Sequence, residues 1–136
     1  VTNLFTSFGY FEKDADEQKA INAMAGNLKK EGILVIDFMN VKKAISNLVA
    51  REQKIIDGIT FKITRKFESN HIIKDIEILD KVIKQHFQEK EKALTLDDFS
   101  NFISKAGLKI IDIFGNYKLE RFEIKTSDRL ILICKK

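Results

Sequence analysis

The sequence predicts an α/β fold with three successive parts: a strand–helix–strand segment, antiparallel hairpin strands, and a helix followed by two buried strands. Residues 1–40 contain a strand, loop, helix and strand in series, and residues 94–136 contain a helix followed by two apolar strands. Between these parts, residues 60–79 alternate between apolar and polar side chains, which is typical of antiparallel strands with one exposed face. A length of 136 residues suits one domain with a substantial core.

The first helix is expected over Asp14–Lys30. Asp14 and Glu17 have the spacing of a capping box, in which each carboxylate accepts a hydrogen bond from a backbone amide of the first turn. Gly32 is expected to end this helical region. Four apolar residues at helical spacing form the stripe that faces the sheet: Ile21, Met24, Ala25 and Leu28.

A buried strand is expected at Ile33–Phe38. The run Ile33–Ile36 is continuously apolar, which favours burial on both faces of a sheet that is covered by helices. With the preceding helix, this strand makes half of a doubly wound α/β unit. Such folds place their sites at the carboxyl ends of strands, so the segment Asp37–Asn40 is a candidate site loop.

The middle of the chain reads as a short helix, about Val41–Leu48, followed by a hairpin. The hairpin strands are Thr60–Glu68, with Phe61, Ile63 and Phe67 on one face, and Ile72–Leu79. The turn between them is Ser69–His71. The next stretch, Lys81–Lys92, is compatible with a helix or with a third strand.

The last third begins with a second capping box, formed by Thr95 and Asp98, and Leu94 and Phe99 have the spacing of a hydrophobic staple. Gly107 is the expected helix stop. Two buried strands follow, joined by a long loop: Leu108–Phe114, Leu130–Cys134 and the loop 115–128.

Composition narrows the function classes. The net charge of +4 comes from basic residues scattered among acidic ones, whereas nucleic-acid binding normally needs basic residues clustered on one face. A single cysteine excludes an internal disulfide and suits a reducing compartment, so a cytoplasmic location is expected. Cys134 lies in an apolar run and reads as a core residue. No apolar run reaches the roughly 18 residues of a membrane helix.

Three segments together resemble a known family. They are Val1–Phe38, which includes the stretch Asn3–Phe11, the helix region Leu94–Gly107, and the chain from Ile113 onward with its Gly115-Asn116-Tyr117 loop and Arg129-Leu130-Ile131-Leu132 strand. In this order they resemble the small-molecule subgroup of class I S-adenosylmethionine-dependent methyltransferases, from the end of the fourth strand onward. The absence of an initiator Met agrees with an expectation that this is a part of such an enzyme.

The resemblance implies a fold and a division of the chain. The fold class is α/β, the C-terminal half of a Rossmann-like methyltransferase sheet with an inserted antiparallel β-hairpin subdomain. Residues 1–136 form a single partial domain, in which residues 1–48 and 94–136 are Rossmann-like and residues 49–93 are the substrate-side insertion. In this layout the last strand lies antiparallel between the fifth and sixth strands, and Lys81–Lys92 is a strand.

The resemblance also implies a function: methyl transfer from S-adenosylmethionine to a nitrogen or oxygen of a small molecule. It places three residues beside the methionine part of the cofactor: Thr2, Asn3 and Leu4. It places six residues at the substrate: Ser7, Gly9, Tyr10, Asn40, Tyr117 and Arg129. From the residues themselves no catalytic acid–base dyad is identified, and the two histidines and one cysteine lack the spacing of a metal site. Read without the resemblance, Phe5, Phe8 and Phe11 pack the first helix, and Arg129 pairs with Asp128 or Glu123. His71 is then a solvated residue at the tip of the hairpin. The resemblance, in contrast, implies that His86 lies in the insertion that faces the substrate.

The residue types suit this chemistry. Aligning a nucleophile with an activated methyl group can lower a barrier by roughly 7–11 kcal/mol without any titrating side chain. Aromatic faces stabilise a cationic sulfonium by about 0.5–2 kcal/mol each. A loop of Phe, Tyr, Ser, Thr and Gly residues supplies such contacts.

One departure from the family limits what this chain does alone. The six glycines are isolated, so the glycine-rich cofactor loop has no counterpart here. The resemblance starts at the end of the fourth strand, so the ribose-binding carboxylate that the family has after its second strand has no counterpart either. The chain is therefore expected to bind the cofactor weakly and to be inactive by itself. An uncovered sheet edge predicts a homodimer or a complementary N-terminal half. The alternative is a non-catalytic dimerisation or ligand-binding module derived from the same fold.

Overall fold

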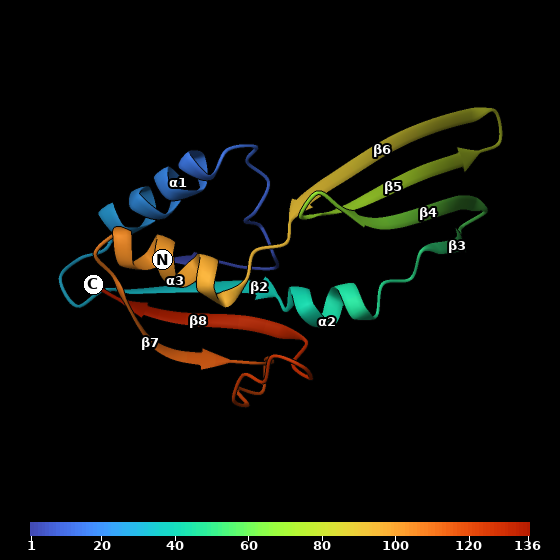
Figure 1. The fold of residues 1–136 in the computed structure, drawn as a ribbon. Coiled ribbons are helices and arrows are strands. Elements are labelled where there is room, and N and C mark those ends of the chain that lie inside the picture. The colour runs from blue at the N-terminus through green and yellow to red at the C-terminus, as the bar shows by residue number, and fades with distance from the viewer. The chain divides into compact units, whose positions relative to one another are not determined.

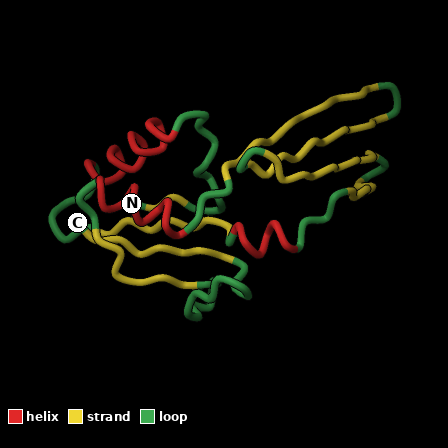
Figure 2. The backbone as a smooth tube through the Cα atoms, viewed as in Figure 1, coloured by secondary structure: helices red, strands yellow, loops and turns green.

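The computed structural model describes all residues from Val1 to Lys136 and divides them into two compact units. Unit 1 combines Val1–Ala44 with Leu94–Lys136, and unit 2 is Ile45–Ala93. Each unit has its own four-stranded sheet (Figures 1 and 2). The α/β fold with a separate antiparallel sheet is confirmed.

The sheet of unit 1 has the strand order β1-β2-β8-β7. β1 (Thr2–Asn3) lies parallel to β2 (Ile33–Met39), while β8 (Arg129–Lys135) lies antiparallel to both β2 and β7 (Lys109–Phe114). The predicted position of the last strand, antiparallel between the two preceding strands, is therefore confirmed. Because β1 and β2 are parallel, their carboxyl ends lie at the same end of the sheet.

Two helices, α1 (Asp14–Gly26) and α3 (Leu96–Lys105), lie on the same side of this sheet (Figure 1). The core between them and the sheet is aromatic. The Phe99 ring on α3 lies 5.1 Å from the Phe38 ring on β2 and 5.6 Å from the Phe8 ring. Of the three early phenylalanines, only Phe8 is in the core, because the side chains of Phe5 and Phe11 are 77% and 47% exposed.

The strand β2 is buried mainly on one face, so the expectation of burial on both faces is wrong. Leu34, Ile36 and Phe38 are buried against the helices, whereas Ile33 is 38% exposed and Val35 is only partly buried. The reason is that α1 and α3 both cover the face that carries Phe38. A continuously apolar run does not show which of its two faces receives the helices.

The predicted capping box of α1 is also wrong. The N-cap residue is Lys13, which makes no side-chain capping bond, and Asp14 is the first helical residue. Glu17 is buried and its Oε1 accepts a hydrogen bond from the backbone N–H of Phe11, 3.2 Å away. The helix ends at Gly26 rather than Lys30, since glycine is a poor helix former and a turn follows it.

The capping box of α3 is confirmed. Thr95 Oγ1 accepts from the backbone N–H of Asp98 at 3.3 Å, and Asp98 Oδ2 accepts from the backbone N–H of Thr95 at 2.8 Å. Both groups satisfy amides that the helix itself leaves without partners. The flanking residues Leu94 and Phe99 are buried.

Replacement of Thr95 by alanine is expected to destabilise unit 1 by about 1 kcal/mol, because the Asp98 amide loses its acceptor. Urea unfolding followed by circular dichroism measures this change. Thr95→Ser is the control, since it keeps the hydroxyl and should stay close to the parent. Equal losses in the two variants would mean that the methyl group, not the cap, matters at this position.

Unit 2 is a meander of four antiparallel strands that pair in chain order: β3 (Arg51–Ile56), β4 (Ile59–Glu68), β5 (His71–Asp80) and β6 (Ile83–Lys92). The predicted hairpin corresponds to β4 and β5, and the ambiguous stretch Lys81–Lys92 is a strand, as the resemblance implied. β3 was not predicted as a strand. The short helix α2 (Val41–Ser46) precedes it.

The meander has one apolar and one polar face. Cross-strand pairing places Phe61 opposite Ile78 and Ile63 opposite Ile76 on the apolar face. The polar face carries the predicted Thr60, Lys62, Thr64 and Lys66, and there His86 lies 3.1 Å from Asp75.

None of the helices in the chain combines the length and apolar character needed to cross a membrane.

Cys134 is fully buried in β8, as predicted, and burial raises the pKa of its thiol to about 12. The thiolate is the reactive form, so the native protein should not react with a disulfide reagent such as Ellman's reagent at pH 8. One thiol per chain should react after denaturation in guanidinium. Rapid labelling of the native protein would contradict the burial of β8.

Candidate functional site

A buried carboxylate, Asp37, lies near the carboxyl end of β2, where parallel α/β sheets place their sites. Only 2% of its side chain is exposed. A buried charge is costly unless it is paired and hydrogen-bonded, and Asp37 meets both conditions. Its partners come from three different parts of unit 1.

The first partner is Arg129, at the start of β8. Its Nε donates to Asp37 Oδ1 at 2.7 Å. The antiparallel register brings them together, because Met39 pairs with Arg129 and the end of β2 therefore meets the beginning of β8. The expected pairing of Arg129 with Asp128 or Glu123 is wrong.

The second partner is the segment that follows β1. The backbone N–H of Phe5 donates to Asp37 Oδ2 at 2.9 Å, and the backbone N–H of Thr6 donates to the main-chain carbonyl of Asp37 at 3.0 Å. Arg129 Nη2 donates to Thr6 Oγ1 at 2.9 Å. Phe5 and Thr6 both have φ of 58°, a left-handed conformation that costs energy for non-glycine residues. The hydrogen bonds to Asp37 and Arg129 stabilise this strained turn.

The third partner is Tyr117, from the loop between β7 and β8. Its hydroxyl donates to Asp37 Oδ2 at 2.9 Å, and the guanidinium carbon of Arg129 lies 5.8 Å from the centre of its ring. Partial desolvation and the hydrogen bond to Asp37 raise the pKa of the Tyr117 hydroxyl. The residue is nevertheless 63% exposed, so its ring is presented to solvent while its hydroxyl is held. We call Thr6, Asp37, Tyr117 and Arg129 the Asp37 cluster.

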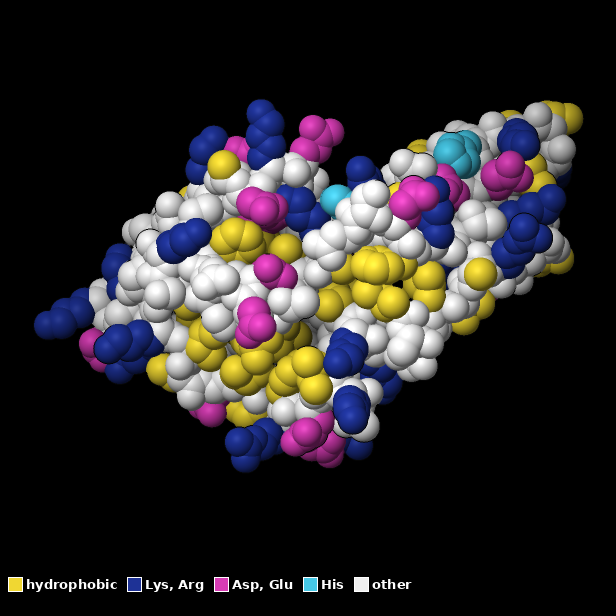
Figure 3. All heavy atoms as spheres, in the orientation of Figure 1, with side chains coloured by type: hydrophobic (Ala, Val, Ile, Leu, Met, Phe, Trp, Pro, Cys, Tyr) yellow, Lys and Arg dark blue, Asp and Glu magenta, His cyan; other side chains and the backbone are white.

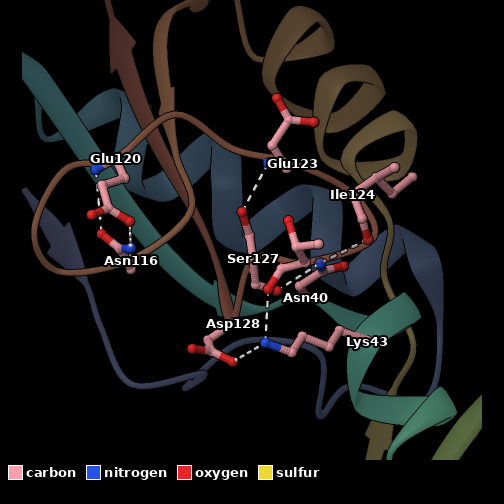
Figure 4. Close-up of polar contacts among 9 residues, drawn as sticks. Asn40, Lys43, Asn116, Glu120, Glu123, Ile124, Ser127 and Asp128 are labelled. Atoms are coloured by element: carbon pink, nitrogen blue, oxygen red, sulfur yellow. Dashed lines mark hydrogen bonds and ion pairs between the residues drawn. The ribbon is translucent and has the colours of Figure 1, made fainter.

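The loop that carries Tyr117 is held by its own polar contacts (Figure 4). Asn116 Oδ1 accepts from the backbone N–H groups of Lys118 and Glu120, and its Nδ2 donates to the Glu120 carboxylate. Such side-chain to backbone bonds are typical of an Asx-type turn. The positive φ of Leu119, 61°, lies within this turn. Tyr117 is therefore carried by a well-defined turn.

The second half of the loop is anchored to the end of β2 and to α2 (Figure 4). Asn40 Nδ2 donates to the carbonyls of Ile124 at 2.9 Å and Ser127 at 2.8 Å. Lys43 Nζ donates to Asp128 Oδ1 at 2.6 Å. A side chain at position 115 would overlap the Ser127 side chain, so only glycine fits there.

The structure brings two of the predicted substrate residues together, Tyr117 and Arg129, at Asp37. Asn40 is buried and uses both amide hydrogens to hold the loop, so only its side-chain oxygen is left for a ligand. Gly9 is buried with φ of 90°, a conformation that favours glycine. Of the other predicted residues, Thr2 and Asn3 form β1, and Leu4, Ser7 and Tyr10 follow it in the chain. Their contacts with ligands stay predictions.

Sequence reasoning included Asp37 in the candidate site loop Asp37–Asn40, but it did not identify Asp37 as the common partner of the site residues, and it missed Thr6. The structure places Asp37 within β2, which extends to Met39, and not in a loop. A signal for Asp37 was present, because a carboxylate directly after Ile33–Ile36 and before Phe38 interrupts an apolar strand. Charged residues are almost never fully buried unless they are paired. Thr6 offers no such signal, since its role depends on the backbone turn after β1.

An apolar cavity of about 320 Å³ lies beside the loop that carries Ile124. Its walls come from the start of α2, the start of α3, the loop and β8, and include Val41, Leu94, Phe122, Ile124 and Leu130. Lys42 and Asp97 supply one charge of each sign to the lining. Hydrophobic side chains also gather on the surface over β7 and the loop after it, where Ile111 and Leu119 are exposed (Figure 3). A cavity of this size suits part of a small organic molecule.

No family model matches this sequence. No curated protein matches it either. Solved structures, in contrast, match with high probability. A S-adenosylmethionine-dependent methyltransferase from Clostridium acetobutylicum superimposes with a TM-score of 0.82 at 21% identity, covering 98% of this chain and 56% of that chain. The methyltransferase CcbJ from Streptomyces caelestis gives a TM-score of 0.80 at 11% identity, covering 98% and 58%.

CalS10, an amino pentose methyltransferase from Micromonospora echinaspora whose structure holds S-adenosylmethionine, gives a TM-score of 0.63 at 15% identity, covering 99% of this chain and 56% of that chain. The chain therefore spans little more than half of the length of these structures. Over that length it has the fold of small-molecule S-adenosylmethionine-dependent methyltransferases.

Proposed function

We propose that this chain forms the substrate-side part of an S-adenosylmethionine-dependent methyltransferase that methylates a nitrogen or oxygen of a small molecule. The observation that carries the proposal is the superposition of 98% of the chain on a methyltransferase with a TM-score of 0.82. The Asp37 cluster supports it, because ordered polar and aromatic groups lie at the carboxyl ends of β1 and β2. In α/β sheets the carboxyl ends of the strands are the usual place for a ligand.

One side chain of β1, Asn3, has an unpaired group that suits the cofactor. Asn3 Oδ1 is buried and has no hydrogen-bond partner in the structure. A buried acceptor without a partner is costly, so an N–H donor placed next to it would be stabilised. The amino group of the methionine part supplies such a donor. We propose that Thr2, Asn3 and Leu4 line this part of the cofactor.

When bound, the cofactor supplies a methyl group that sulphur has already activated, so the protein mainly has to align the acceptor with it. In our proposal, Ser7, Gly9, Tyr10, Asn40, Tyr117 and Arg129 line the mouth through which the acceptor enters. The ring of Tyr117 faces the solvent side of this mouth. The strained turn at Phe5 and Thr6 keeps the main chain close to the carboxyl end of β2.

Calorimetry with S-adenosylhomocysteine tests the function. We expect the product of the complete gene to bind it, and the 136-residue chain alone to bind weakly, since no glycine-rich loop is present in it. An Asn3→Leu variant of the complete product should bind more weakly, whereas Asn22→Leu, on the exposed side of α1, should not change binding. No binding by the complete product would overturn the methyltransferase assignment and favour a non-catalytic module.

We also propose that the free edge of β1 is covered, either by a second copy or by the segment that completes the methyltransferase sheet. β1 pairs with β2 on one side only, and Val1 and Leu4 beside this edge are 46% and 38% exposed. Uncovered edges with apolar neighbours favour association. Light scattering of the 136-residue chain should show dimers or larger species; a monodisperse monomer would contradict this expectation.

A further inference from the structure

We propose that Asp37 is a positioning residue that fixes both walls of the proposed substrate mouth, the turn at Phe5 and Thr6 and the loop that carries Tyr117. The inference rests on the proposed function only in taking the space between these two loops to be a substrate mouth. The claim itself is that one buried carboxylate couples the conformations of the two loops. Asp37 itself does not touch the reacting atoms.

The first argument is the number of donors that converge on Asp37. Oδ2 accepts from the Phe5 backbone N–H and from the Tyr117 hydroxyl, both at 2.9 Å. Oδ1 accepts from Arg129 Nε at 2.7 Å. Both oxygens thus face donors, so the position requires a group that only accepts. Asparagine has nearly the same shape, but in either orientation its NH₂ would face a donor and at least one contact would be lost.

The second argument is that the contacts form a closed ring. Asp37 holds Phe5, Phe5 is covalently joined to Thr6, Thr6 Oγ1 accepts from Arg129, and Arg129 pairs with Asp37. Two charged groups and two left-handed residues belong to this ring. The turn cannot relax to an ordinary backbone conformation without breaking a charge-assisted hydrogen bond. Tyr117 joins the ring at Asp37 Oδ2, so the second loop is tied to the same atom as the first.

The third argument concerns what the site presents to a ligand. The Tyr117 hydroxyl is used by Asp37, while 63% of the residue is exposed. The part of Tyr117 offered to a ligand is therefore the ring and not the hydroxyl. An aromatic face favours apolar or cationic groups. The mouth is thus suited to an acceptor that brings an alkyl or ammonium group against Tyr117.

A spectroscopic titration tests the contact between Asp37 and Tyr117. The chain has two tyrosines and no tryptophan, so in a Tyr10→Phe background the ultraviolet signal of tyrosinate reports Tyr117 alone. We expect the pKa of Tyr117 to lie above that of free tyrosine, and to move down when Asp37→Asn is added, because the hydrogen bond and the negative charge are lost. Asp128→Asn is the control: Asp128 is on the same loop, pairs with Lys43 and does not touch Tyr117. An ordinary pKa for Tyr117 in the Tyr10→Phe protein would overturn the proposal without any further variant.

Hydrogen exchange tests the coupling of the two loops. With Asp37→Asn, amides at residues 5–6 and at residues 116–120 should both exchange on the order of tenfold faster or more, as expected for loss of hydrogen bonds to a charged group. Exchange in α3 and β7 should rise less than exchange in these two loops. A variant that only weakens the fold would speed exchange to a similar extent throughout unit 1, and a change in one loop without the other would disprove the coupling.

The two proposals fail in different ways. Titration and exchange as expected, with no binding of S-adenosylhomocysteine by the complete gene product, would keep the positioning role and remove the methyltransferase function. Binding of S-adenosylhomocysteine with an ordinary Tyr117 titration would do the opposite.

Discussion

Replacing Phe99 by alanine is expected to destabilise unit 1 by about 3–5 kcal/mol, as for other fully buried phenylalanines. Phe99 has no exposed surface, and its ring packs between those of Phe8 and Phe38. The substitution leaves a cavity where the loop after β1, the helix α3 and the sheet meet. Because a typical domain is stable by only about 5–15 kcal/mol, this variant should be close to unfolding at 37 °C.

Urea unfolding of the parent and of Phe99→Ala measures the effect. The matched control is Phe5→Ala, which removes the same atoms from a side chain that is 77% exposed. The control should change the unfolding free energy by less than about 0.5 kcal/mol, as is usual for surface positions. Similar losses in both variants would mean that the aromatic core between α3 and β2 is not formed as described.

The second large effect is expected at Arg129. Arg129→Met keeps much of the aliphatic length but removes the charge, so Asp37 is left buried without its cation. Breaking a buried ion pair in this way costs about 3–5 kcal/mol, most of it from the uncompensated charge. The same urea experiment measures it. Lys19→Met, which breaks the exposed pair between Lys19 and Asp16 on α1, should have little effect.

A double variant separates the charge from the packing. Asp37→Leu combined with Arg129→Met removes both charges, and it should recover part of the stability that Arg129→Met alone loses. If the double variant were instead as unstable as the sum of the two single variants, the destabilisation would come from packing or from the lost hydrogen bonds of Phe5 and Tyr117.

What the sequence could predict depended on how far apart the interacting residues lie. The Thr95 and Asp98 cap was predictable because its partners are three residues apart and need no other part of the chain. The same pattern at Asp14 and Glu17 failed, since Phe11, outside the helix, offers Glu17 a different donor. Local patterns are reliable only where no tertiary contact competes.

Unit 2 shows a signal that was present and not used. The dipeptide Asp57-Gly58 follows β3, and both residues have positive φ, 51° and 79°, as two-residue hairpin turns require. This turn predicts a strand on each side of it, and β3 is the strand that sequence reasoning left out. The predicted position of β8 within its sheet, in contrast, came only from the resemblance to a family, because local periodicity does not determine strand order.

The Asp37 cluster could not be assembled from the sequence. Asp37 and Arg129 belong to strands that meet only after β8 has been placed next to β2, and the pairing of Arg129 with the nearby Asp128 looked equally reasonable. Tyr117 and Arg129 were predicted at the site through the resemblance, without a common partner. Asp37 was included in the candidate site loop Asp37–Asn40, but nothing in the sequence showed that Tyr117 and Arg129 share it as a partner.

The insertion of unit 2 between two segments of unit 1 has a consequence for the order of folding. Each strand of the meander pairs with its neighbour in the chain, so unit 2 needs only short loops to be closed. Unit 1 has to pair Ile33 with Lys135, 102 positions apart in the sequence. Because local pairings form faster than distant ones, unit 2 is expected to fold first and to shorten the connection that unit 1 must close. Slowing the meander, for example by replacing Gly58 in its first turn, should then delay the appearance of the sheet in unit 1 as well.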